Sequence, residues 1–163
     1  MKRTIFKVLM LVLALSVSVQ AIAMGDEQQV EYSTAITEGN LPLVKNYIEK
    51  GIAKVNEEFF GWTALENASN SGQIKVVEYL LDKGANPNHQ HPISKNSAFH
   101  LAAFNNNAEL VKVLAKRGVD VNLKLRGDVS ILRAIRDMGN TQMVELLTSV
   151  GVKDDGCLEE KCN

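Results

Sequence analysis

The spacing of apolar residues along the chain follows the period of an amphipathic helix in four segments. In the second segment, Val76, Val77 and Leu80 lie on one side of such a helix, and Lys75 and Glu78 lie on the other. A glycine, the residue best suited to cap a helix at its carboxyl end, follows each segment directly. The pattern predicts helices at 41–50, 74–83, 108–117 and 141–150.

A shorter segment, rich in small residues, precedes each of these helices. Thr63, Ser97 and Ser130 stand where three of these segments begin, which is typical of helix N-caps. Alanines such as Ala68 and Ala102 allow neighbouring helices to approach closely. We therefore expect a second set of helices at 33–37, 63–70, 97–105 and 130–137.

Two series of turn residues repeat with the same step. Steps of 33, 34 and 33 residues separate Gly51, Gly84, Gly118 and Gly151. The same steps separate Gly39, Gly72, Asn106 and Gly139, and Asn is the residue that best replaces Gly in a left-handed turn. A period of this length with two phased series predicts a repeated two-helix unit.

The motifs within each unit resemble the ankyrin repeat. The family opens a repeat with Gly-x-Thr-Pro-Leu-His and closes it with Gly-Ala-Asp-x-Asn, and the runs at 61–66, 84–88, 97–103 and 118–122 match these patterns in part. Glu66 and Arg133 stand where the family keeps His, no inner turn has its Pro, and the first unit lacks its hairpin strand. The resemblance implies an all-α solenoid of about four helix-turn-helix units with short β-hairpin fingers. We expect the repeats over 31–153, with units at about 31–57, 58–90, 91–124 and 125–153.

Residues 1–23 have the layout of a secretory signal peptide. Lys2, Arg3 and Lys7 precede an apolar stretch, 8–19, that is too short to span a bilayer, and small residues follow at 21–23. An uncleaved anchor or a buried helix are the alternatives. We expect cleavage after Ala23, a short polar segment at 24–30, and no stable membrane insertion afterwards.

The net charge limits the class of partner, and the two cysteines indicate a disulfide in the tail. Loss of residues 1–23 leaves 15 Lys and Arg against 19 Asp and Glu, a formal charge of −4 that argues against a nucleic-acid partner. Cys157 and Cys162 both lie in the tail, 154–163, and we expect them to form a disulfide in an oxidising compartment, with a redox-active pair as the alternative. Such a short loop would restrain the tail rather than hold the fold together.

Catalytic and metal-binding patterns are weak. No Gly-x-Ser-x-Gly run or glycine-rich phosphate loop occurs in the sequence. His89 and His91 are interpreted as residues of a solvated loop, with a metal-ligand pair as the alternative. His100 occupies the position of the family's structural His, which implies a role in the core. We expect neither a metal nor another cofactor.

The resemblance also implies where a partner protein would bind. Ankyrin proteins use the fingertips and the groove side of the inner helices, and four aromatic residues at such positions would form an apolar patch. Phe59 and Phe60 have an alternative role as a cover for the first unit. The predicted partner-binding residues are Phe59, Phe60, Trp62, Ser94, Asn96, Phe104, Asn105, Arg126, Asp137 and Met138.

Taken together, the signal pattern and the repeats predict a non-catalytic, monomeric protein-binding module in the bacterial periplasm. An inhibitor, immunity or accessory protein for an envelope or secreted enzyme is the leading hypothesis. Stress protection in the periplasm and secretion as a host-directed effector are alternatives. A metal-dependent enzyme using His89 and His91 is the most distant one.

Overall fold

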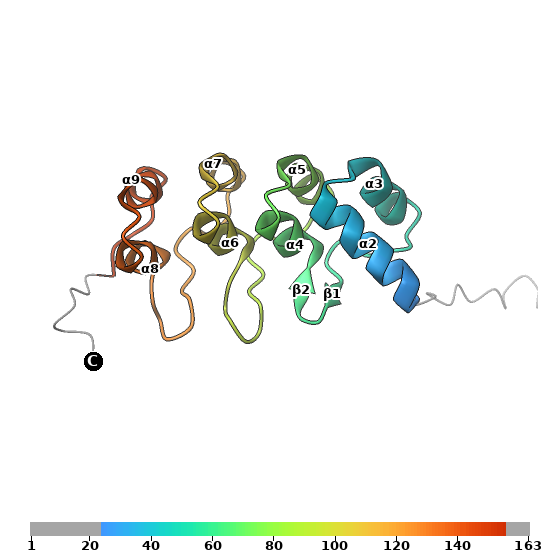
Figure 1. Ribbon diagram of the computed structural model, residues 1–163, viewed down its shortest axis with the longest axis horizontal. Helices are drawn as coiled ribbons and strands as arrows, with labels where there is room; N and C mark the ends of the chain where they lie inside the picture. The colour runs from blue at the N-terminus through green and yellow to red at the C-terminus, as the bar shows by residue number, and fades with distance from the viewer. Residues whose placement is uncertain (1–23, 156–163) are drawn as a thin grey trace, which may run out of the picture.

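The computed structural model describes residues 24–155, which form a row of helix pairs (Figure 1). Inner helices form one layer and outer helices the other, and each pair packs against the next. The inner helices are α2 (Asp26–Glu38), α4 (Ala64–Asn70), α6 (Ala98–Phe104) and α8 (Ile131–Asp137), and the outer helices are α3 (Leu41–Glu49), α5 (Ile74–Asp82), α7 (Ala108–Lys116) and α9 (Thr141–Ser149). The predicted all-α solenoid of helix-turn-helix units is confirmed.

Local hydrogen bonding explains why the later inner helices begin where they do. The hydroxyl oxygens of Thr63, Ser97 and Ser130 each accept a hydrogen bond from the amide three residues ahead, as predicted. Between the two helices of the third unit, Asn106 has a φ of 54°, close to the 69° of Gly72 in the second unit. Asn therefore does replace Gly at a left-handed position.

The first inner helix is longer than predicted, because α2 begins at Asp26 rather than at Ser33. Most of the polar segment 24–30 is therefore helical. Gly25 precedes the helix and its amide donates to the side chain of Gln28, while Asp26 and Glu27 place negative charge in the first turn. Tyr32 anchors the helix, because its ring is fully buried and stacks on Tyr47 at 5.1 Å.

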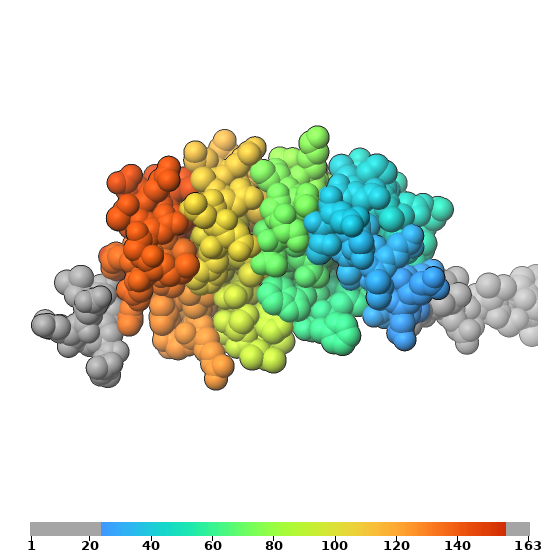
Figure 2. All heavy atoms as spheres, viewed as in Figure 1, coloured from blue at the N-terminus to red at the C-terminus, as the bar shows by residue number. Residues whose placement is uncertain are grey.

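A finger joins each outer helix to the next inner helix. Each finger is numbered by the unit that it opens, so the second finger lies between α3 and α4. In the second finger, strands β1 (Glu58–Phe59) and β2 (Trp62–Thr63) pair antiparallel, with Phe59 opposite Trp62. The third and fourth fingers are each closed by a backbone hydrogen bond, from His91 to Asn96 (2.8 Å) and from Leu125 to Val129 (2.9 Å). The space-filling view shows the units side by side along one axis, with fingers projecting along one edge (Figure 2).

The core runs continuously between the two layers of the stack. Side chains such as Leu80, Leu110 and Leu147 are fully buried in it. Polar contacts also join successive units: the carbonyl oxygen of the Asn56 side chain accepts from the Asn86 amide (2.7 Å), and that of Asn88 accepts from the Asp120 amide (2.8 Å). Among residues 24–155, no helix is long and apolar enough to cross a membrane.

Candidate functional site

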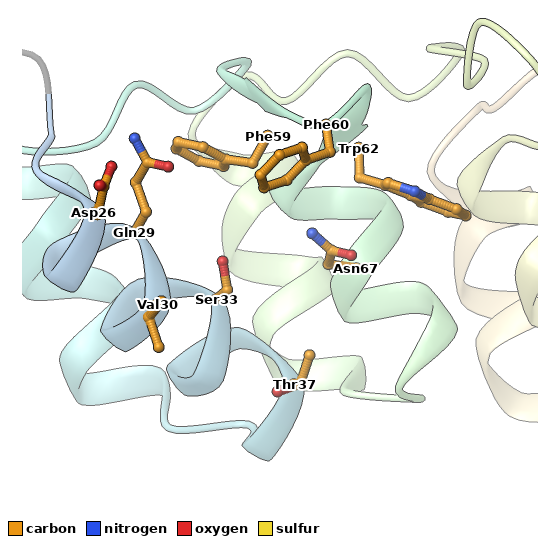
Figure 3. A pocket seen from close by; sticks show the side chains of 9 residues that line it. All are labelled: Asp26, Gln29, Val30, Ser33, Thr37, Phe59, Phe60, Trp62 and Asn67. Carbon is orange, nitrogen blue, oxygen red and sulfur yellow. The ribbon is translucent and has the colours of Figure 1, made fainter.

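A groove of about 440 Å³ opens at the amino-terminal end of the stack, between α2, the second finger and α4 (Figure 3). Its exposed surface is mostly apolar. The residues that line it are Asp26, Gln29, Val30, Ser33, Thr37, Phe59, Phe60, Trp62 and Asn67. Because three separate segments supply these side chains, the groove exists only when the first and second units are packed together.

Phe60 is the most unusual residue of the groove. Its side chain is 95% exposed, although it is large and apolar. Phe60 and Gly61 connect β1 to β2 with positive φ values of 55° and 81°, as in a type I′ turn, where the first position favours Asn, Asp or Gly. A bulky residue in this conformation lowers stability by roughly 1 kcal/mol. Such a local conflict with folding is typical of a functional position.

Replacing this residue by Asn is expected to stabilise the protein. Phe60→Asn places the preferred residue at the first turn position and removes an exposed ring, so we expect the free energy of unfolding to rise by about 1 kcal/mol. Urea denaturation followed by circular dichroism measures the change. Phe60→Ala is the matched control, since it removes the ring and leaves a residue that also disfavours positive φ; an equal gain in both variants would contradict the turn argument.

The other two aromatic residues of the second finger are anchored by neighbours. Phe59 is half-buried. Its ring and that of Tyr32 pack edge to face, with the ring centroids 6.4 Å apart, so Phe59 does help to cover the first unit. The Trp62 ring packs against the His91 ring in a tilted arrangement, with the two ring centroids 4.7 Å apart. His91 is buried, and its Nδ1 accepts from the amides of Ile93 and Ser94. The interpretation of His91 as a solvated loop residue was therefore wrong, because its ring packs between two fingers.

His89 is likewise not a free loop residue, because it lies between two carboxylates. Its Nδ1 is 2.9 Å from Oε2 of Glu66 and its Nε2 is 3.0 Å from Oε1 of Glu58. Both ring nitrogens therefore face carboxylate oxygens, and the ring is held between the two acidic side chains. Within residues 24–155, no group of three or more His, Cys, Asp or Glu side chains is arranged to hold a metal ion.

Glu66 explains why His89 occupies this place. Glu66 is 1% exposed, and its Oε2 also accepts from the amide and the hydroxyl of Thr63 at 2.8 and 2.9 Å. In the next unit His100 holds the corresponding position, where Nδ1 accepts from the Ser97 amide (3.1 Å) and Nε2 donates to the Leu123 carbonyl (3.0 Å). His100 is thus a buried core residue, as expected. Glu66 lacks the imidazole N–H that His100 donates to a carbonyl, and its Oε2 instead lies within hydrogen-bond distance of the His89 ring.

The remaining predicted residues lie outside the groove. Ser94 and Asn96 shape the third finger, and Phe104 is half-buried against the core. Asn105 donates to the carbonyl of Asn70 at 2.8 Å. Arg126, Asp137 and Met138 are exposed farther along the stack. Of the predicted set, only Phe59, Phe60 and Trp62 line the groove.

Sequence reasoning missed the contribution of α2 to the groove. Asp26, Gln29 and Val30 line it, but they precede the position where the helix was expected to begin. Val30 is the single apolar residue of the polar run 25–31, and this was the one signal in the sequence for a contribution from this segment. Cys157 and Cys162 lie outside the described residues, and their pairing stays a prediction.

Comparison with known proteins agrees with the geometry. Residues 65–115 match the family described as "Ankyrin repeats (many copies)". The chain is 31% identical over 125 residues to "Ankyrin repeat, SAM and basic leucine zipper domain-containing protein 1" of Homo sapiens, which covers 73% of this chain and 26% of that protein. It is also 31% identical over 119 residues to "Ankyrin repeat and SAM domain-containing protein 6" of Rattus norvegicus, covering 71% of this chain and 13% of that protein.

The chain thus spans about a quarter or less of these relatives. Their shared feature with it is the repeat, and each unit described above has the paired helices of that repeat. Repeats of this kind stack into an extended surface on which other proteins bind. Residues 65–115 thus match the ankyrin-repeat family directly, and the paired helices of residues 24–155 have the arrangement of an ankyrin-repeat stack.

Proposed function

We propose that the chain is a non-catalytic protein-binding module that holds its partner in the groove between α2, the second finger and α4. The exposed Phe60 ring beside this apolar groove carries the proposal. Exposed aromatic residues beside a hollow are typical of the few positions that dominate binding energy. The backbone conformation of Phe60 adds support, since folding alone favours another residue there.

The signal pattern in residues 1–23 supports a place of action in the bacterial periplasm. Within that compartment the proposed role is inhibition or accessory binding of an envelope or secreted enzyme, because a small stack with an exposed apolar groove suits stoichiometric binding. Cell fractionation tests the location: the protein should appear in the periplasmic fraction with residues 1–23 removed. Retention of the full-length chain in the cytoplasm would contradict the location and leave the groove proposal to its own test.

The binding proposal is tested by affinity capture from the periplasmic extract of the source organism. We expect the wild-type protein to retain a stoichiometric partner, and Phe60→Ala to weaken its affinity by roughly 30-fold, as for a central aromatic residue. Ile93→Ala is the matched control, since Ile93 is also apolar and 71% exposed but lies on the third finger outside the groove.

Both variants should keep the helical circular dichroism of the wild type, so that a loss of binding reports on contact rather than on folding. Trp62 is the chain's single tryptophan and lines the groove, so its fluorescence can follow titration with the captured protein. A partner that binds Phe60→Ala as tightly as wild type, without a change in this fluorescence, would show that the binding surface lies elsewhere.

A further inference from the structure

The charged residues of the groove lining and of α2 are all acidic. Every charged residue of α2 is acidic, namely Asp26, Glu27, Glu31 and Glu38. Asp26 itself lines the groove, whereas Glu31 accepts a hydrogen bond from Tyr47. The groove lining contains no Lys, Arg or His. An apolar surface with an acidic rim repels acidic segments and attracts basic ones.

Two basic residues of the first two units, Lys45 and Lys83, do not offset this charge. Lys45 and Lys83 lie near the Tyr79 ring in the outer layer, with their ammonium groups 5.3 and 5.5 Å from its centroid. Lys83 is also 3.6 Å from Glu49, on α3. Both side chains therefore contact residues of the outer layer and do not line the groove. His89 is near the second finger, but its two ring nitrogens already face Glu58 and Glu66.

Resting on the proposed function, we propose that the segment held in the groove presents a large apolar side chain next to a Lys or Arg. The apolar side chain would lie against Val30 and Phe60, covering two of the most exposed large apolar residues of the described chain. The neighbouring cation would contact the Asp26 carboxylate at the groove's rim. A cation beside Phe60 would also be attracted to the face of its ring.

The chemistry of the groove favours a polypeptide over a nucleic acid, which would bring a row of phosphates to an acidic rim. It also favours a segment of mixed character over a purely apolar one. An apolar side chain alone leaves Asp26 without a cation, whereas a flanking Lys or Arg adds attraction during encounter and a contact in the complex. The partner is therefore a basic, amphipathic segment of a protein.

Selection from a random-peptide phage library against the purified protein tests this inference even while the natural partner is unidentified. We expect enriched sequences to carry a large apolar residue beside Lys or Arg. One enriched peptide is then synthesised and titrated against variants by Trp62 fluorescence. Asp26→Asn should weaken its affinity by roughly 3-fold and Asp26→Lys by roughly 10-fold, and added salt should reduce both effects.

Glu78→Gln is the matched control, because Glu78 is an exposed carboxylate on α5, outside the groove, and its removal should leave affinity unchanged. Enriched peptides that lack basic residues, bind through Phe60 and ignore Asp26→Lys would overturn the inference while the proposed function stands. Failure to enrich any peptide whose binding is lost in Phe60→Ala would overturn both.

Discussion

His89→Ala is expected to lower the free energy of unfolding by about 3 kcal/mol, and the melting temperature by roughly 10 °C. The variant removes the imidazole from beside Glu66, whose side chain is 1% exposed and whose Oε2 lies 2.9 Å from Nδ1 of His89. A buried carboxylate that loses this neighbour and keeps only the Thr63 donors must either stay charged with fewer hydrogen bonds or take up a proton, and both lower stability. Thermal denaturation followed by circular dichroism measures the loss.

A second background isolates the charge from the packing of the ring. Glu66→Gln removes the charge and keeps an oxygen for the amide of Thr63, as the capping box permits. In that background His89→Ala should lower stability by less than about 1 kcal/mol, because no buried charge remains. Equal losses in the two backgrounds would mean that His89 acts by packing alone. Glu58→Gln, on the exposed side of the imidazole, should change stability by less than about 1 kcal/mol.

Acidification from pH 7 to pH 4 is expected to destabilise the protein by roughly 3 kcal/mol through His100 alone. Burial lowers the pKa of His100 from 6.5 to about 4, against the smaller opposing effect of its hydrogen bond to the Leu123 carbonyl. In the unfolded chain His100 therefore takes up a proton near pH 6.5, whereas in the folded protein His100 takes one up only near pH 4. The contribution is complete above pH 6.5 and is lost as the pH falls through this interval.

Urea denaturation at a series of pH values tests this dependence. His100→Gln is the control, because glutamine cannot titrate and still suits the third position of a capped helix. The variant will be less stable at pH 7, but its stability should fall by roughly 3 kcal/mol less than that of the wild type on acidification. Parallel pH profiles would show that His100 is not the group responsible.

Most of the fold was predictable because single residues of characteristic type determine its turns and helix caps. A residue with left-handed backbone conformation separates the two helices of each unit, and the regular spacing of these residues reveals the repeat. Thr63, Ser97 and Ser130 mark where three of the inner helices begin. The start of α2 was not predictable in the same way. Its first turns are polar, and the buried residues that hold it, such as Tyr32 and Ile36, come later in the helix.

The groove was predictable only in part, for a related reason. Phe59, Phe60 and Trp62 lie close together in one finger, so a family resemblance could place them on one surface. The contacts of His89 depend on a replacement at Glu66, which is distant in sequence, and only the packed structure shows that the two side chains meet. Phe104 stands at the family position of a groove residue but is half-buried against the core.

The groove crosses the boundary between the terminal unit and the next one, which has a consequence for its affinity. In a stack whose units contact only their neighbours, an end unit can detach while the rest stays folded. Detachment of α2 and α3 would remove Asp26 and Val30 from the groove and leave the second finger without its opposite wall. The measured affinity is then the intrinsic affinity reduced by the fraction of molecules with the end unit detached. Binding in turn holds that unit in place, so a partner protects the amino-terminal helices from proteolysis and hydrogen exchange before it affects the rest of the stack.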